Sequence, residues 1–244
     1  MKRTITYSSY TDKGSREMNE DAIGYKFIGD RCCFLLCDGL GGHGMGEVAS
    51  SLAIKAFECQ FEEYDNPSEF LMNAFQAAQD IITAEQKAQH AINKMKTTAV
   101  IVSINNDRIH FGHIGDSRVY MFRRNRVVMR TLDHSVPQML ALSGEIKETE
   151  IRNHPNRNIL LRVLGVEWNE PMYVISEPIP IRKIDAFLLC SDGFWELIDE
   201  SDMCTMLKES NSVAEWMSRM RSLVESNGQG IDMDNNSAIA VWIK

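Results

Sequence analysis

The chain has 244 residues, of which 44% are hydrophobic and 25% are charged, and its formal net charge is −8. No linker-like segment divides it, so we expect a single domain spanning residues 1–244. The acidic balance argues against nucleic-acid binding as the main role, and no run approaches the roughly 18 consecutive apolar residues of a membrane span.

The N-terminal part of the chain predicts two β-strands. Residues 4–10 and 22–28 have the β-branched and aromatic content of strands, whereas the polar segment 11–21 between them is typical of a loop. A basic pair stands near the start, but no apolar segment follows it. We therefore expect no signal peptide and a cytoplasmic protein.

A short apolar run that ends in an acid and a glycine occurs twice. Phe34–Gly39 is repeated as Phe187–Gly193, with one residue inserted before the acid. Each run predicts a strand that is buried on both faces. Two acids placed at the ends of such strands repel each other unless they are protonated or bridged by a cation. The repeat therefore suggests a metal site that contains Asp38 and Asp192.

A helical hairpin is predicted after the glycine-rich loop 40–46. The apolar spacing favours a helix from about residue 47 to residue 64, and Pro67 suits the first turn of a second helix. The apolar face expected for the second helix continues to residue 95. It comprises Leu71, Ala74, Phe75, Ala78, Ile81, Ala88, Ile92 and Met95.

The rest of the chain alternates between β-rich and helical patterns. Four short runs separated by turn residues predict an antiparallel meander: 98–104, 108–114, 118–123 and 127–131. A more irregular stretch, 133–170, follows. The remaining elements are predicted as strands at 172–177, 186–190 and 237–243, and helices at 199–208 and 212–226. Helices segregated from a mostly antiparallel sheet indicate an α+β sandwich.

Five acids stand at predicted strand ends or in tight turns: Asp21, Asp38, Asp116, Asp192 and Asp234. A single Asp in a turn is usually structural, but the set together points to a metal site. Carboxylates without paired His or Cys ligands favour magnesium or manganese, and such ions serve phosphoryl chemistry in two-metal centres. Asp38, at the end of a buried run, is the natural bridge between two ions.

Several other residues that could take part in binding or catalysis have two interpretations each. Arg16 is either a surface residue or a residue whose planar guanidinium binds two phosphate oxygens. The arginines at the predicted hairpin tip, residues 123–130, are either solvated or dock a phosphorylated or acidic partner. The six cysteines form no CxxC pair, and we expect buried free thiols rather than a disulfide or zinc framework.

Eight motifs in order resemble one enzyme family over essentially the whole chain. They are Arg16-x-x-Asn19-Glu20-Asp21-Ala22, Asp38-Gly39-x-Gly41-Gly42-His43 through Ser50, Thr97-Thr98-Ala99, His113-x-Gly115-Asp116-Ser117-Arg118-x-Tyr120, Asp133-His134-Ser135, Leu161-Arg162-x-Leu164-Gly165, Ser191-Asp192-Gly193 and Asp234-Asn235. On these residues the chain resembles the bacterial metal-dependent protein phosphatases of the type 2C serine/threonine class.

The resemblance implies a fold and a set of roles. The fold is a central antiparallel β-sandwich with helices outside each sheet, in four layers (α-β-β-α). By similarity, Asp38 bridges two manganese or magnesium ions, the Gly39 carbonyl binds one, and Asp192 and Asp234 hold the other. A weaker third ion would use Asp116 with Asp192, Asp21 would act through metal-bound water, and Glu20 would support it. Arg16 would grip the substrate phosphate.

Two parts of the resemblance concern the edges of the site. Animal members place a His directly after the first Asp-Gly, as a proposed general acid, whereas this chain has Leu40 there. Bacterial members often have a His three residues further on, which matches His43, so His43 either protonates the leaving group or only supports the glycine loop. The segment around 138–158 would form a flap where protein substrates are distinguished.

The implied activity is hydrolysis of phosphoserine and phosphothreonine in proteins by a water that bridges the two metals. The implied functional opponent is a serine/threonine kinase, and we expect a monomer. Three alternatives use similar residues. A two-metal nuclease would need a basic groove, and a binding module with an inactive site would have lost metal acids that are present here. Hydrolysis of a small phosphate ester stays open, because the metal ions and the arginine contact only the phosphate and not the protein around it.

Overall fold

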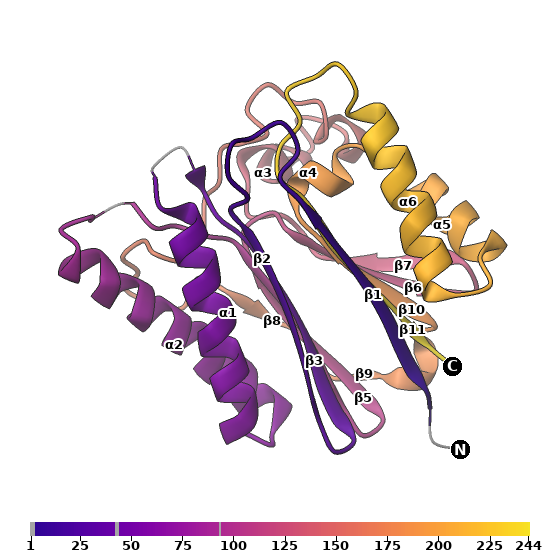
Figure 1. Ribbon diagram of the computed structural model, residues 1–244, viewed down its shortest axis with the longest axis horizontal. Helices are drawn as coiled ribbons and strands as arrows, with labels where there is room; N and C mark the ends of the chain where they lie inside the picture. Colours follow the sequence, from indigo (N-terminus) through magenta and orange to yellow (C-terminus); the bar gives the residue numbers. More distant parts are fainter. Residues whose placement is uncertain (1–2, 42–43, 93) are drawn as a thin grey trace.

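Two antiparallel sheets form the centre of the computed structural model, which describes residues 3–41, 44–92 and 94–244 (Figure 1). The first sheet has the strand order β1-β11-β10-β6-β7 and the second has the order β2-β3-β4-β5-β8, with β9 also paired to β5. The strands of the first are β1 (Ile5–Asp12), β11 (Asn236–Ile243), β10 (Ala186–Cys190), β6 (Arg118–Arg123) and β7 (Arg126–Arg130). Those of the second are β2 (Asp21–Ile28), β3 (Arg31–Asp38), β4 (Ala99–Asn105), β5 (Arg108–Ile114), β8 (Val174–Ile175) and β9 (Ile179–Pro180).

Helices cover the outer face of each sheet. The hairpin of α1 (Gly46–Glu63) and α2 (Pro67–Ala88) packs on the second sheet, and α5 (Glu200–Glu209) and α6 (Val213–Asn227) lie outside the first (Figure 1). The predicted four-layer α+β architecture is therefore confirmed. Within the described residues, no helix is both long and apolar enough to cross a bilayer.

The two copies of the apolar repeat face each other in the core between the sheets. Phe34 of β3 and Phe187 of β10 have ring centroids 5.6 Å apart, nearly edge to face. Both side chains are fully buried, and burial of a Phe stabilises a fold by about 1.5–3 kcal/mol. Because the copies pack side by side and run toward the same end of the sandwich, their terminal acids emerge close together.

The second predicted helix is too long. Helix α2 ends at Ala88, and the chain then turns through His90 at a positive φ of 51°. Gln86, on the last turn, donates hydrogen bonds to the carbonyls of Met95 and Gly165 at 3.1 and 2.7 Å. Met95 is thus a buried residue of the loop after α2 and not of the helix. The prediction extended the helix to residue 95 because Met95 is apolar and matches the helical spacing.

The helix face is also displaced by one residue near its C-terminal half. Ile82 is fully buried, whereas Ile81, predicted to face the sheet, is 39% exposed. Ala78 allows either an i+3 or an i+4 neighbour on the buried face. The sequence alone could not decide between two adjacent isoleucines.

The predicted four-strand meander is wrong. Strands β4 and β5 pair in the second sheet, whereas β6 and β7 pair in the first. The chain crosses between the sheets at Gly115, where φ is +97° and an added Cβ would lie 2.6 Å from the Thr98 side chain. This crossing places Asp116 at the end of the sandwich, between the two sheets.

Two short helices and the segment predicted to form a flap lie near that same end. Helix α3 (Val136–Ser143) and the 3-10 turn η2 (Glu148–Glu150) fall in the stretch predicted as irregular, and α4 (Asp192–Trp195) follows β10 directly. A bridge between Ser135 and Leu160 closes the base of the intervening segment. A second 3-10 turn, η3 (Ile181–Lys183), precedes β10.

Candidate active site

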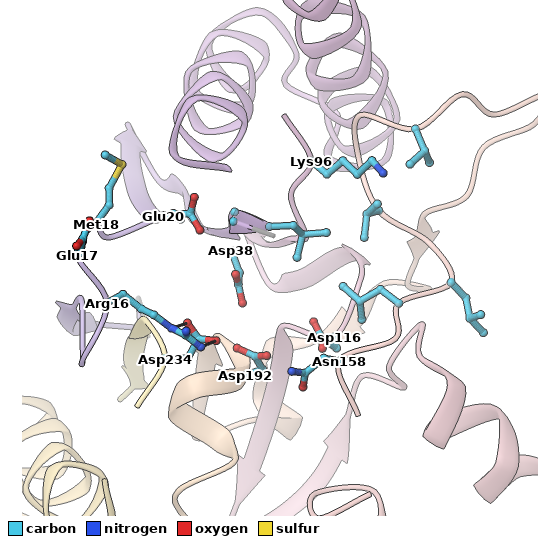
Figure 2. Close-up of a pocket in the computed structure, with 17 residues that line it drawn as sticks. Arg16, Glu17, Met18, Glu20, Asp38, Lys96, Asp116, Asn158, Asp192 and Asp234 are labelled. Carbon is cyan, nitrogen blue, oxygen red and sulfur yellow. Dashed lines mark hydrogen bonds and ion pairs between the residues drawn. The ribbon is translucent and has the colours of Figure 1, made fainter. Parts of the chain in front are cut away.

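Seven of the nine predicted site residues line one pocket of about 840 Å³ at the end of the sandwich (Figure 2). They are Arg16, Glu20, Asp38, Gly39, Asp116, Asp192 and Asp234. Asp21 is half-buried and is not among the lining residues. His43 lies outside the described residues, so its predicted role stays a prediction. Figure 2 shows the carboxylates of Asp38, Asp116, Asp192 and Asp234 grouped around the centre of the pocket.

Asp38 is fixed by the neighbouring strands. It pairs in register with Asp21 of β2, and its carbonyl accepts a 2.8 Å hydrogen bond from the Thr98 amide. The Thr98 hydroxyl in turn accepts from the Asp38 amide at 3.2 Å. The next residue must be glycine, because a Cβ on Gly39 would lie 2.3 Å from the Gly46 carbonyl oxygen. The backbone at the first Asp-Gly step is therefore closely held.

Asp192 occupies the start of α4, immediately after β10. Its Oδ1 accepts a 2.6 Å hydrogen bond from the Gly193 amide. The preceding residue, Ser191, donates from its hydroxyl to Oδ2 of Asp21 at 2.9 Å and accepts from the Ser237 amide at 2.9 Å. Ser191 therefore ties β10, β11 and the start of β2 together behind the pocket.

Asp116 is positioned through its backbone. The indole N–H of Trp195, at the end of α4, donates to the Asp116 carbonyl at 3.0 Å. The guanidinium of Arg118 stacks 3.4 Å from the centre of that indole ring and forms a bidentate ion pair with Asp133 at 2.8 and 2.6 Å. This buried cluster holds the Asp116 turn against the helix that begins with Asp192.

Asp234 is paired with the predicted phosphate-binding arginine. Arg16 donates from Nε and Nη2 to the two Asp234 oxygens at 3.0 and 3.1 Å, and from Nη1 to Asp232 at 3.3 Å. The side chain of Asn235 accepts from the Glu20 amide at 2.8 Å and donates to carbonyls in the same loop. The loop that carries Arg16 is thus held against the residues that precede β11.

The acids raise one another's pKa. Burial, and then the charge of Asp192, holds the pKa of Asp38 well above its usual value. Burial and the charge of Asp234 raise the pKa of Asp192. Burial, followed by Asp192, has the same effect on Asp116, and burial raises the pKa of Asp21 to about 7. The contact between the two carboxyl groups further raises the pKa of Asp38 and lowers that of Asp192.

The donor set fits hard divalent cations. It consists of carboxylates and a backbone carbonyl, which magnesium and manganese prefer. A buried oxygen of Asp21, Oδ1, has no hydrogen-bond partner within the described ranges of the chain. As they stand, no three His, Cys, Asp or Glu side chains in the described part of the chain are arranged to hold one ion. Asp234 is paired with Arg16, and the carboxyl group of Asp38 interacts with that of Asp192. To hold cations, these acids would have to exchange those partners for metal.

Sequence reasoning gave no individual role to several residues that shape the site. Asn235 and Ser191 each adjoin a predicted metal acid, and that adjacency is the signal that could have singled them out. Trp195 and Lys96 carry no such signal. Lys96 lines the pocket because its backbone lies beside the glycine loop, a contact between segments distant in the sequence.

Known proteins resemble this chain in sequence and in fold. The sequence profile described as Protein phosphatase 2C matches residues 12–236. The serine/threonine phosphatase stp of Listeria welshimeri is 32% identical over 213 residues, which is 84% of each chain. The crystal structure of the serine/threonine phosphatase Stp1 from Staphylococcus aureus superposes with a TM-score of 0.88 at 26% identity, covering 99% of this chain and 96% of that one.

A further solved structure bears on the metals. The catalytic domain of the serine/threonine protein phosphatase PstP, in complex with two manganese ions, has a TM-score of 0.79 and 26% identity and covers 99% of both chains. The profile match spans most of the sequence, and the Listeria relative exceeds 30% identity over more than two thirds of it. The chain belongs to the protein phosphatase 2C family.

Proposed function

We propose that this protein is a metal-dependent serine/threonine protein phosphatase that hydrolyses phosphoserine and phosphothreonine in proteins. The observation that carries the proposal is the grouping of four carboxyl groups beside an arginine in one pocket (Figure 2), three of which, those of Asp38, Asp116 and Asp192, have a raised pKa. Family membership and the manganese-bound PstP structure support manganese or magnesium as the cofactor.

Each acid has a proposed role. Asp38 would lie between two cations, with the Gly39 carbonyl on one of them and with Asp192 and Asp234 on the other. Asp116 would join Asp192 at a third cation. Asp21 would act through metal-bound water, and Glu20, which lines the pocket, would support it. When bound, the cations would supply a water of lowered pKa and neutralise charge on the phosphate.

The chain's own residues orient the substrate. Arg16 would exchange Asp234 for two phosphate oxygens, since its planar fork matches either partner. The opposite wall of the pocket is apolar and includes Leu160, Leu161 and Val163, which limits water around the phosphorylated side chain. These residues follow the proposed flap, 138–158. His43 is the proposed proton donor to the leaving alcohol.

The cellular setting is also part of the proposal. The substrates would be phosphoproteins, their phosphates would be placed by an opposing serine/threonine kinase, and residues 1–244 would act as one monomeric catalytic domain. The cytoplasmic location expected from the sequence stays a prediction.

The assay that tests the function removes and restores the metal. We expect the purified protein with manganese to release phosphate from a phosphothreonine peptide and from p-nitrophenyl phosphate, and EDTA to abolish both activities until manganese is returned. Turnover that persists in EDTA would exclude the dinuclear mechanism. Turnover of p-nitrophenyl phosphate but of no phosphopeptide would favour a small-molecule phosphomonoesterase.

Replacement of Arg16 separates substrate binding from metal binding. We expect Arg16→Ala to lower kcat/KM for phosphopeptides at saturating manganese by about a hundredfold or more, because the substrate loses a bidentate charge-assisted contact. Arg16→Lys should recover only part of that loss, since an ammonium cannot form the fork. Arg221→Ala is the matched control, as that exposed arginine pairs with Glu225 on α6. An Arg16→Ala variant with wild-type kcat/KM would contradict the assignment.

A further inference from the structure

The pocket contains a second basic side chain that has no partner among the residues that the structure describes. Six acids line the pocket, together with two basic residues, Arg16 and Lys96. Arg16 is engaged by Asp234 and Asp232. The ammonium of Lys96 forms no ion pair or hydrogen bond with any described residue, although its side chain is half-buried. Of the described residues that line the pocket, Lys96 is therefore the basic one that is available to a ligand.

The backbone of Lys96 is fixed where three segments meet. Its carbonyl accepts a 2.9 Å hydrogen bond from the Leu40 amide. The next residue, Thr97, bridges to Gly39 on one side and to Leu164 on the other. The backbone of Lys96 thus lies at a defined point of the pocket, between the glycine loop 40–46 and the segment around Leu164 that follows the proposed flap.

Lys96 is also set apart from the reaction centre. In Figure 2, Lys96 and Arg16 lie on opposite sides of Asp38, and the Lys96 side chain extends away from the carboxylates. The pocket of about 840 Å³ falls in the range of about 300–1,000 Å³ that accommodates a whole drug-sized ligand. It has room for more of a substrate than one phosphorylated side chain.

The surroundings of Lys96 favour an anion with an apolar neighbour. Leu160, Leu161, Val163 and Val166 line the pocket with it, and a cation beside an apolar wall is less screened than one in open water. An anionic side chain that reached this wall would therefore gain more there than at an exposed lysine.

We propose that Lys96 forms a second anion-binding subsite, which binds a carboxylate or a second phosphate on the substrate segment beside the phosphorylated residue. The inference rests on the proposed function, and it adds a substrate class: phosphopeptides with acidic or doubly phosphorylated flanks. Arg16 serves the phosphate that is hydrolysed, and Lys96 serves the neighbouring anion.

The test compares substrates rather than absolute rates. Four substrates are assayed at saturating manganese: p-nitrophenyl phosphate and three phosphothreonine peptides whose flanks are neutral, acidic, or neutral with a second phosphothreonine. We expect the wild type to prefer one or both anionic peptides over the neutral one by about threefold to tenfold in kcat/KM. Whichever anionic peptide gains more identifies the source of the anion.

Variants assign the preference to Lys96. Lys96→Gln should remove it, mainly through KM, and Lys96→Glu should reverse it. Lys94→Gln, an exposed lysine two residues away that does not line the pocket, should keep the wild-type ratio. A wild type without preference, a Lys96→Gln variant that keeps it, or a loss that is equal for all four substrates would overturn the subsite.

Failure of the proposed function itself would look different. In that case the wild type would hydrolyse none of the four substrates. Fluorescence anisotropy with labelled versions of the three peptides would then decide the subsite separately: tighter binding of the anionic peptides that is lost in Lys96→Gln supports it, and equal binding by both proteins overturns it.

Discussion

Asp38→Asn should abolish phosphatase activity and at the same time stabilise the protein in EDTA. The first effect follows from the proposed place of Asp38 between the two cations. Loss of residues that only support a metal ligand already costs about 10- to 100-fold, so loss of the ligand itself should lower kcat/KM by more than about a hundredfold. Asp80→Asn, on the exposed face of α2, is the matched control and should keep full activity with the phosphothreonine peptide.

The second effect follows from the raised pKa of Asp38. A carboxyl whose pKa is higher in the folded than in the unfolded chain makes unfolding easier as pH rises above about 4, because the unfolded chain releases its proton first. Asparagine has no proton to lose. We therefore expect Asp38→Asn to raise the free energy of unfolding in EDTA by about 1 kcal/mol or more at pH 7.5, since one pKa unit corresponds to about 1.4 kcal/mol.

Urea unfolding at pH 5 and pH 7.5 measures this effect. The increase in the free energy of unfolding caused by Asp38→Asn should be smaller at pH 5, where the wild-type carboxyl stays protonated to a greater extent in the unfolded chain. With manganese present, the wild type should instead be the more stable of the two proteins. A variant that is less stable than the wild type in EDTA at pH 7.5 would show that the hydrogen bonds of Asp38 outweigh its charge.

Arg118→Met should be the most destabilising change outside the metal acids. Arg118 and Asp133 are 3% and 5% exposed. Without Arg118, the remaining ion pair of the buried Asp133 among the described residues is a longer one of 3.8 Å to Arg130, and removing one partner of a buried pair costs about 3–5 kcal/mol. Urea unfolding with manganese present checks this value. Arg219→Met, which breaks an exposed pair with Glu215 on α6, should cost less than about 1 kcal/mol.

Arg118→Met should also weaken the binding of manganese at the site. Arg118 supports Trp195, whose N–H holds the Asp116 turn, so the manganese concentration needed for half-maximal activity should rise. Replacing both partners, as Arg118→Met with Asp133→Leu, should recover part of the stability because no charge is then left unpaired. A double variant less stable than either single one would contradict this account of the pair.

Local patterns in the sequence were enough for most strands, both long outer helices and the carboxylates. Phe34–Gly39 and Phe187–Gly193 revealed two buried strands with acids at their ends, because a short apolar run reports burial directly. They could not reveal that the two phenylalanines touch, which depends on how the sheets stack. For the same reason the crossing at Gly115 was missed, since a turn within a sheet and a turn between sheets use similar residues.

The supporting residues of the site were hidden for a related reason. Trp195 and Arg118 look like ordinary core and strand residues in the sequence, and their roles arise only when β6, α4 and the Asp116 turn are brought together. Lys96 is likewise positioned by its hydrogen bond with Leu40 of the glycine loop and by its neighbour Thr97, which forms a bridge with Leu164, 67 residues further along the chain. The sequence specifies the reactive groups, whereas long-range packing specifies what surrounds them.

The ion pair between Arg16 and Asp234 has a consequence for the order of events at the site. While they are paired, the Arg16 guanidinium is not available to phosphate and the Asp234 carboxylate is not available to a metal ion. A metal ion that binds Asp234 therefore releases Arg16, and a phosphate that binds Arg16 releases Asp234. The two ligands must then favour each other by the same factor, since coupling between binding sites is reciprocal. Manganese should tighten the binding of inorganic phosphate, and phosphate that of manganese, which calorimetry of each titration in the presence of the other can compare. Product left in the pocket would then retain the metal, and metal supply would govern how readily the enzyme lets its product go.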